Sequence, residues 1–261
     1  MAGLYVKDND TWYLPKSIWV KSGTWRVCSN VYVKSGGTWK ELIKTVDITS
    51  SKSNFNLYEY LGSPSEPLSV VVNISSSVEI FSSDTSGNRT PAFTVGNFPT
   101  NSTVIINNNG YISGGGGFGG KGTWYGYDSG SNGTKGGDGI VKGSSNNFDI
   151  SIVNTGTIAG GGGGGGGGRG FSIQPDPYSS SISVAGNTGG QGAGITGYSR
   201  TQGGTPTSRS GGNPNQQGGG GNGGSLGEDG ISDLKSAGAG GKAIGSGIEV
   251  AVSGTIIGAV G

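Results

Sequence analysis

The sequence predicts a mostly β N-terminal region with three tandem hairpins, followed by a glycine-rich domain of packed polyglycine II helices, with almost no α-helix. Three observations predict this fold class: a motif that recurs three times near the N-terminus, a second motif that precedes glycine runs, and the uneven distribution of glycine. Glycine makes up 59 of the 261 residues, and nearly all of it follows Ser113. We therefore expect a threefold hairpin repeat in 1–45, a small β linker domain in 46–113 and a glycine-rich domain in 114–261.

The first repeat combines an aliphatic residue, an aromatic residue, Val-Lys, a short polar turn and Thr-Trp. It occurs at Leu4–Trp12, Ile18–Trp25 and Val31–Trp39. Such self-similarity at a fixed interval indicates repeated structural units. Each turn contains residues that tolerate positive φ between two β-prone arms, so each unit is expected to be a hairpin.

With these turns, Val and Trp of each unit are expected to lie opposite one another as cross-strand pairs. The pairs are Val6 with Trp12, Val20 with Trp25, and Val33 with Trp39. Two interpretations remain open for the tryptophans. They form the core of a small β-prism, or they present a pseudo-threefold surface that suits a threefold-symmetric partner.

Short β-branched runs separated by turn residues occupy 46–113 and predict a small antiparallel domain without catalytic groups. The second repeat begins at the end of this stretch: Ile106–Gly114 aligns with Ile152–Gly160 and, more loosely, with Val250–Gly258. Each copy is expected to form a strand, a turn around the aligned glycine and a second strand. Two copies lead directly into glycine runs, which gives each run a fixed origin and direction.

The glycine-rich part cannot be ordered by a conventional core, because Thr196–Ser225 has no aliphatic side chain. Order would have to come from main-chain hydrogen bonds between extended helices of three residues per turn, which glycine alone allows to pack side by side. The alternative is a disordered glycine-rich linker, which would be cleaved rapidly by proteases after Ser113. The expected rods are Gly114–Gly122, Gly133–Gly139, Gly160–Gly170, Gly186–Gly197, Gly218–Gly224 and Gly238–Gly247.

The segments between the rods are rich in aromatic and polar side chains, a composition typical of recognition loops on a rigid frame. The other interpretation is that some of these aromatic side chains cover the outer faces of the packed polyglycine helices. The candidate receptor-binding residues are Trp124, Tyr125, Tyr127, Asp128, Phe171, Asp176, Tyr178, Tyr198, Arg200, Arg209, Asn213 and Gln216.

Composition excludes several functional classes. The chain has no histidine and a single cysteine, Cys28, so no metal site, internal disulfide or cofactor is expected. A formal net charge of +1 without a basic stripe argues against nucleic acid as a partner. No apolar run reaches the roughly 18 residues of a membrane span, and Met1–Asp10 lacks the features of a signal peptide.

An enzyme is one alternative, because Gly115–Lys121 has the spacing of a phosphate-binding loop, G-x-x-x-x-G-K. Gly122, however, stands where such a loop needs Ser or Thr, and no helix is expected to follow. A structural or ice-binding polyglycine protein is the other alternative, because a lattice of rods can present a flat face. That class should show a strict tripeptide period, whereas the tracts here are irregular and separated by bulky segments.

Together, the threefold repeat, the motif Ile-X-Asn-X-Gly-X-Ile-X-Gly and the glycine tracts with aromatic interruptions resemble a known family across the whole chain. This is the receptor-recognising adhesin at the distal tip of the long tail fibre of T-even-like bacteriophages. The resemblance implies a virion protein. From the sequence itself we expect a protein that is made in the host cytoplasm without a signal peptide, is not an enzyme and does not insert into membranes. The resemblance also implies packed polyglycine helices whose loops bind a porin-type outer-membrane protein or lipopolysaccharide and so determine host range.

For the N-terminal region, the resemblance implies attachment to the trimeric distal tail-fibre protein, with one adhesin capping a threefold tip. The fibre-binding candidates are then the matched positions of the repeat: Val6, Trp12, Val20, Trp25, Val33 and Trp39.

Overall fold

A computed structural model describes residues 6–8, 11–13, 19–22, 24–27, 31–35, 38–83, 89–123, 130–143, 147–168, 171–173, 182–184, 193–194, 222–232, 235–252 and 254–261. The protein is mostly β in these residues. Their helical content is limited to the four-residue α1 (Leu57–Tyr60), which Asn56 caps by accepting the amide of Glu59.

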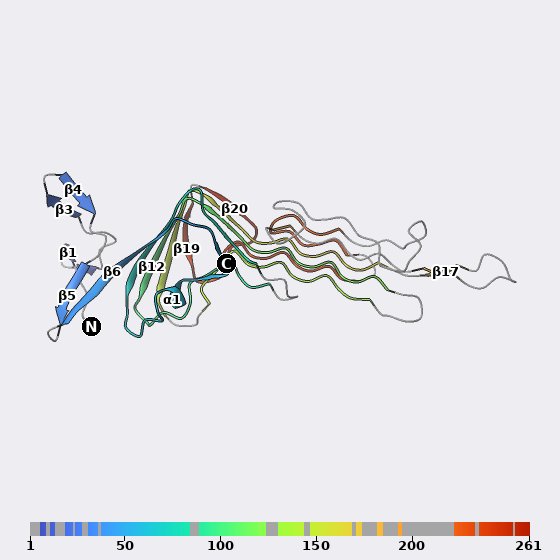
Figure 1. The fold of residues 1–261 in the computed structure, drawn as a ribbon, viewed down its shortest axis with the longest axis horizontal. Helices are drawn as coiled ribbons and strands as arrows, with labels where there is room; N and C mark the ends of the chain where they lie inside the picture. The colour runs from blue at the N-terminus through green and yellow to red at the C-terminus, as the bar shows by residue number, and fades with distance from the viewer. Residues whose placement is uncertain are drawn as a thin grey trace.

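The centre of the molecule is a three-sided parallel β-helix (Figure 1). A six-stranded sheet has the order β19-β15-β12-β9-β6-β5, a five-stranded sheet β20-β16-β13-β10-β7, and a three-stranded sheet β14-β11-β8. Successive strands of the chain enter successive sheets, so each coil adds one layer to each side. Isolated parallel bridges of Ile140 with Ile244 and of Ile244 with Val260 continue the third side through the last two coils.

The strands of the three sides are short and regular. In the six-stranded sheet they are β5 (Val31–Ser35), β6 (Thr38–Ile48), β9 (Ser69–Ile74), β12 (Thr103–Asn108), β15 (Asp149–Asn154) and β19 (Glu249–Val252). In the five-stranded sheet they are β7 (Lys52–Ser53), β10 (Glu79–Phe81), β13 (Tyr111–Ser113), β16 (Thr157–Ala159) and β20 (Thr255–Ile257). The three-stranded sheet contains β8 (Phe55–Asn56), β11 (Phe93–Thr94) and β14 (Ile140–Val141).

The antiparallel pairing that we expected within 46–113 is wrong. The strands β6, β9 and β12 pair in parallel, as do β7, β10 and β13. The turns between consecutive runs change the direction of the chain at a corner of the β-helix instead of reversing it, so each strand meets its equivalent from the next coil. Strands on both sides of Ser113 contribute to the same sheets.

The second repeat stacks on itself in the register that its sequence alignment predicts. Ile106 pairs with Ile152, and Ile112 with Ile158. The third copy continues both rows through Val250 and Ile256. The strand–turn–strand expectation is confirmed, with the two strands of each copy in different sheets and the aligned glycine at the corner between them.

Those corner glycines stack so closely that no side chain fits. A Cβ on Gly156 would lie 2.1 Å from the carbonyl oxygen of Gly110, and a Cβ on Gly254 would lie 2.3 Å from that of Gly156. The conserved spacing of this glycine within the three copies therefore reflects the approach of one coil to the next.

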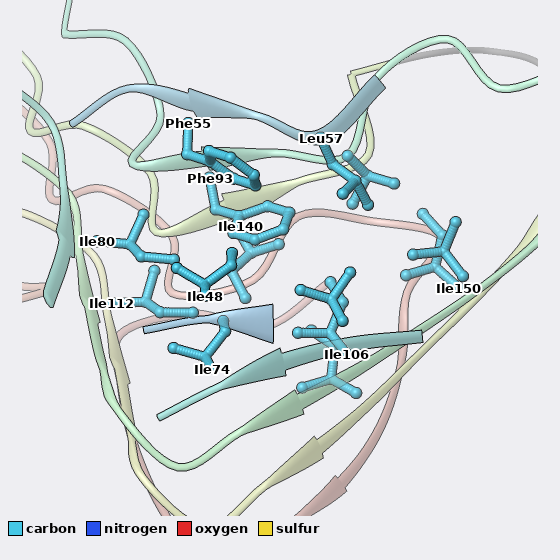
Figure 2. Packing of buried hydrophobic residues seen from close by; sticks show 14 of the residues in the cluster. Ile48, Phe55, Leu57, Ile74, Ile80, Phe93, Ile106, Ile112, Ile140 and Ile150 are labelled. Carbon is cyan, nitrogen blue, oxygen red and sulfur yellow. The ribbon is translucent and has the colours of Figure 1, made fainter. Parts of the chain in front are cut away.

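A continuous apolar core fills the β-helix (Figure 2). Aliphatic side chains from equivalent positions of successive coils stack in rows, such as Ile80 with Ile112. The rings of Phe55 and Phe93 meet edge to face at 5.2 Å between centroids. Full burial of each such side chain contributes about 1.5–3 kcal/mol, so the core anchors the parts of the chain that lack one.

At one corner, buried asparagines replace aliphatic residues. Asn108 and Asn154 pair in register and are fully buried, and the side-chain amide of Asn108 donates to Oδ1 of Asn154 at 2.8 Å. Asn154 in turn donates to the carbonyl of Thr255. This ladder ties three coils together where the chain turns toward the five-stranded sheet.

In the N-terminal region, three antiparallel strand pairs follow one another: β1 (Val6–Asp8) with β2 (Thr11–Tyr13), β3 (Trp19–Ser22) with β4 (Thr24–Val27), and β5 with β6. The predicted cross-strand pairing of Val with Trp is wrong. Lys occupies the position opposite Trp in all three pairs: Lys7 and Trp12, Lys21 and Trp25, Lys34 and Trp39.

The error has one physical cause. We placed Asp8, Ser22 and Ser35 in the turns, whereas each is the last residue of its first strand and pairs with Thr. The connection between the arms is consequently shorter than we assumed, and the register shifts by one residue.

Candidate functional site

Two long excursions leave the β-helix at one corner, between the five-stranded and the three-stranded sheets. The first coil crosses this corner with Asn54 alone, and the last coil with Gly258 and Ala259. The third coil instead inserts 114–139 and the fourth inserts 160–243. In Figure 1 the excursions extend as long traces away from the N-terminal strands.

The described parts of the excursions form straight segments that we call rods: 114–123, 130–139, 160–168, 222–227, 228–232 and 235–243. Rods 114–123 and 160–168 continue the ladder between β13 and β16. Every third residue of rod 114–123 donates to β16 or to rod 160–168, with N···O distances of 2.8–3.0 Å: Gly114 to Ala159, Gly117 to Gly162, Gly120 to Gly165, and Thr123 to Gly168.

Rod 130–139, which runs back toward the β-helix, forms hydrogen bonds with the same three-residue period to neighbouring rods. Gly161 donates to Gly137 and Gly164 to Thr134, so rod 130–139 runs antiparallel to rod 160–168. On its other side, rod 130–139 donates to rod 235–243, which runs parallel to it: Gly133 to Ser236, Gly136 to Ala239, and Gly139 to Lys242.

Rod 160–168 lies at the centre of this lattice, and each of its residues is buried. Three consecutive glycines of this rod each face a different neighbouring rod, and the pattern repeats every three residues. A Cβ on Gly163 would lie 1.9 Å from the carbonyl oxygen of Gly238, one on Gly164 would lie 1.9 Å from that of Phe118, and one on Gly162 would lie 2.1 Å from that of Gly224. Because main chain surrounds all three faces, Gly160 to Gly164, Gly166 and Gly167 have no room for a side chain.

Polar side chains complete the hydrogen bonding at the edge of the lattice. Oδ1 of Asn132 accepts the amide of Ser236 at 3.2 Å, and Oδ1 of Asp138 accepts the amide of Lys242 at 2.7 Å. Asp138 also forms an ion pair with Lys135 at 2.9 Å. Sequence reasoning missed these acceptors, although their spacing of six residues, two turns of a threefold rod, carries the signal.

Two contacts fix the rods to the β-helix. The guanidinium of Arg89, from the connection between β10 and β11, lies 4.2 Å from the ring centroid of Phe118 on the first rod. A small apolar cluster of Ala159, Ala193 and Leu226, with Tyr111 and Ile257 packed against it, joins the rods to the five-stranded sheet. No feature of the sequence identifies Arg89 as a clamp.

Nearly all predicted receptor-binding residues lie outside the described residues: Trp124, Tyr125, Tyr127, Asp128, Asp176, Tyr178, Tyr198, Arg200, Arg209, Asn213 and Gln216. Phe171 begins β17 (Phe171–Ile173), which pairs antiparallel with β18 (Ile182–Val184). In Figure 1, β17 is the labelled strand that lies farthest from the β-helix. The segment 124–129 connects Thr123 and Gly130, the outer ends of two rods.

The predicted fibre-binding positions all fall in the N-terminal strands. Val6, Trp12, Val20 and Trp25 lie in β1 to β4, one in each. Val33 and Trp39 lie in β5 and β6, so the third repeat is part of the six-stranded sheet.

The part of the chain that the structure describes was compared with three features: metal clusters, membrane spans and a phosphate-binding loop. Those residues contain no group of three or more His, Cys, Asp or Glu side chains arranged to hold a metal ion. They also contain no helix of the length and hydropathy that a membrane span requires. Gly115–Lys121, the near-match to a phosphate-binding loop, lies within the first rod, where the residues that follow continue the rod up to Thr123.

The sequence model of the phage tail fibre adhesin Gp38 family matches residues 43–261, which include the β-helix and the whole rod region. The chain belongs to this family. Its members are adhesins of phage tail fibres, which makes the protein a binding component of the virion. The match begins in β6, after the first two strand pairs.

Among solved structures, the chain is similar to one in the gp37–gp38 adhesin tip complex of the bacteriophage S16 long tail fibre. The two are 24% identical, the TM-score is 0.44, and the similarity covers 85% of this chain and 83% of the other. None of the curated proteins that were compared matches the chain.

Proposed function

We propose that this adhesin sits at the distal tip of the tail fibre and binds a receptor on the host surface through the segments at the outer ends of its rods. The receptor would be a porin-type outer-membrane protein or lipopolysaccharide, and its choice would set host range. The observation that carries this proposal is the hydrogen-bond ladder that passes from the β-helix into the rods without a change of register.

That ladder gives the tip a rigid support. We assign the rods to polyglycine II helices, because donation at every third residue matches a helix with three residues per turn. Rods that bond to neighbours on several sides hold their outer ends at defined positions. A binding segment anchored at both ends on such a frame loses less conformational entropy when it binds.

The composition of the outer segments supports a role in recognition. Residues 124–129 contain Trp124, Tyr125 and Tyr127 in six positions, and 171–181 add Phe171 and Tyr178. Aromatic residues supply a large contact area with few rotatable bonds, whereas small polar residues supply adaptable hydrogen bonds. Segments with this composition suit a protein or glycan surface.

Exchange of segments tests the receptor site. Replacement of 124–129 or of 174–181 with unrelated polar sequence of equal length should abolish binding to host cells while thermal stability stays unchanged. Replacement of 63–66, in the loop between α1 and β9 on the β-helix, is the matched control and should bind normally. Full binding by both distal exchanges would exclude these segments from the receptor site. Hosts lacking individual porins or outer lipopolysaccharide sugars then identify the receptor.

We also propose that the N-terminal repeats attach the adhesin to the trimeric distal fibre protein. Three similar units suit a threefold partner, and they lie at the end of the molecule opposite the rods (Figure 1). Changing Trp12, Trp25 and Trp39 to Ala should release the adhesin from the fibre. Retention of a folded triple variant on the fibre would contradict this attachment.

A further inference from the structure

Two adjacent aliphatic side chains lie at the centre of the outer face of the six-stranded sheet, next to a row of hydrogen-bonded Asp47, Asn73 and Asn107. Residues of β9 and β12 alternate between the core and the outside, and Val71 and Ile105 lie at adjacent outward positions. Thr45 on β6 pairs with Val71 and extends the row. On β15, Ser151 continues this row beside Ile105, whereas the outward Val153, which is 44% exposed, lies in the next row beside Asn107. β-branched side chains thus lie side by side on three neighbouring strands, β6, β9 and β12.

Acidic residues surround this apolar centre. Asp47 and Asp149 lie at exposed outward positions on β6 and β15, and Glu249 does so on β19. No lysine or arginine occupies an outward position of β9, β12, β15 or β19, all of which the structure describes. The surface therefore carries net negative charge at its rim.

This outer face belongs to the same sheet as the third N-terminal repeat. β5 pairs with β6, which pairs with β9, so Trp39 and Thr45 are on one strand. Figure 1 shows the six-stranded sheet on the side of the molecule where β1 to β5 lie, with the rods extending in the other direction. A partner bound to the N-terminal repeats can reach this face, whereas a receptor at the rod ends cannot.

We propose that the outer face of the six-stranded sheet is a second contact for the tail-fibre tip, which meets it with an aliphatic centre and a rim of lysine or arginine. This inference rests on the proposed attachment of the N-terminal repeats to the fibre. A second copy of the adhesin does not suit the face, because two identical acidic rims would repel one another. A partner with basic residues gains both apolar burial and electrostatic attraction.

Lysine substitutions at the centre test the contact. Val71→Lys and Ile105→Lys should each weaken binding to purified distal fibre protein at least tenfold and leave binding to host cells unchanged. Val141→Lys is the matched control, because Val141 is half-buried at an outward position of β14 in the three-stranded sheet. It should bind the fibre like the unmodified adhesin.

The acidic rim is tested separately by the paired change Asp149→Lys and Glu249→Lys. Association with the fibre should become slower, and its rate should lose most of its dependence on salt, since charge at the rim acts mainly on encounter. An unchanged salt dependence would contradict the basic rim that we assign to the partner.

A third experiment avoids the lysine substitutions, which could destabilise the sheet. A photo-crosslinker is attached to the cysteine of the Val153→Cys variant, in which Cys28 is replaced with Ser. It should form a covalent product with the fibre protein, and the same label at Ser246, which is exposed beyond the third side, should not. Normal affinity of the lysine variants together with absence of this product would overturn the second contact. If Trp25→Ala still abolishes binding in that case, the attachment itself stands; if the unmodified adhesin does not bind the fibre, both proposals fail.

Discussion

Replacing Gly163 with Ala tests whether main-chain packing alone forces glycine along the central rod. The new Cβ would lie 1.9 Å from the carbonyl oxygen of Gly238, although real Cβ atoms essentially never approach closer than 3.0 Å. Rod 235–243 would therefore have to move outward by about 1.1 Å. No flexible side chain lies at the contact to absorb the shift.

The cost follows from the hydrogen bonds between the two rods. Lys235, Gly238 and Gly241 donate to rod 160–168 at 3.1, 2.8 and 2.7 Å. A rigid shift of this size would lengthen each bond to about 4 Å, beyond the useful range for N–H···O bonds. At about 1 kcal/mol for each lost bond, the substitution should destabilise the rods by about 3 kcal/mol.

Hydrogen exchange followed by mass spectrometry measures this effect locally. Peptides from 160–168 and 235–243 should exchange at least one hundredfold faster in the Gly163→Ala variant, whereas β-helix peptides should keep their protection. The matched control is Gly245→Ala, where the nearest atom to the new Cβ lies at an ordinary 3.4 Å, so protection should not change. Equal protection of the rods in both variants would refute the packing argument.

Three further predictions concern the lattice and its anchor. Exchanging Gly117 and Phe118 leaves composition unchanged but places a ring where a Cβ would already lie 2.1 Å from a carbonyl oxygen, so the rods should lose protection as in the Gly163→Ala variant. Asp138→Ala should lower the free energy of unfolding, measured by thermal denaturation, by about 1–2 kcal/mol, because it removes an acceptor for a main-chain amide. Lys135→Ala removes only an exposed ion pair and should lower that free energy by less than about 0.5 kcal/mol. Asn154→Ala should lower the stability of the β-helix by about 1–3 kcal/mol in chemical denaturation, since it leaves a buried side-chain amide without its acceptor; an unchanged midpoint would show that the ladder is dispensable.

The sequence predicted the β-rich character and the stacking of the second repeat, because an aligned motif at equivalent positions of successive coils must pair with itself. Ile112 with Ile158 is an example. It did not predict parallel pairing. Short β-branched runs between turn residues are typical of both antiparallel sheets and β-helices, and only the angle of each turn separates the two.

For the candidate site, composition indicated where glycine is required but not which rods are neighbours. The expectation that main-chain hydrogen bonds join the glycine tracts agrees with the ladder from Gly114 to Gly168. The central place of rod 160–168 depends on contacts with 114–123 and 235–243, which are distant in sequence. The contact of Arg89 with Phe118 could not be predicted either, because it depends on how the second coil meets the first rod.

The corner from which both excursions leave has a consequence for how such proteins diversify. Since the first coil closes the same corner with Asn54 alone, a coil of this β-helix can be completed without an insertion there. An excursion can be lengthened, shortened or replaced by recombination as one cassette, provided that its two ends return to neighbouring strands. Under the proposed function, a new receptor contact at the rod ends would then need no compensating change in the β-helix.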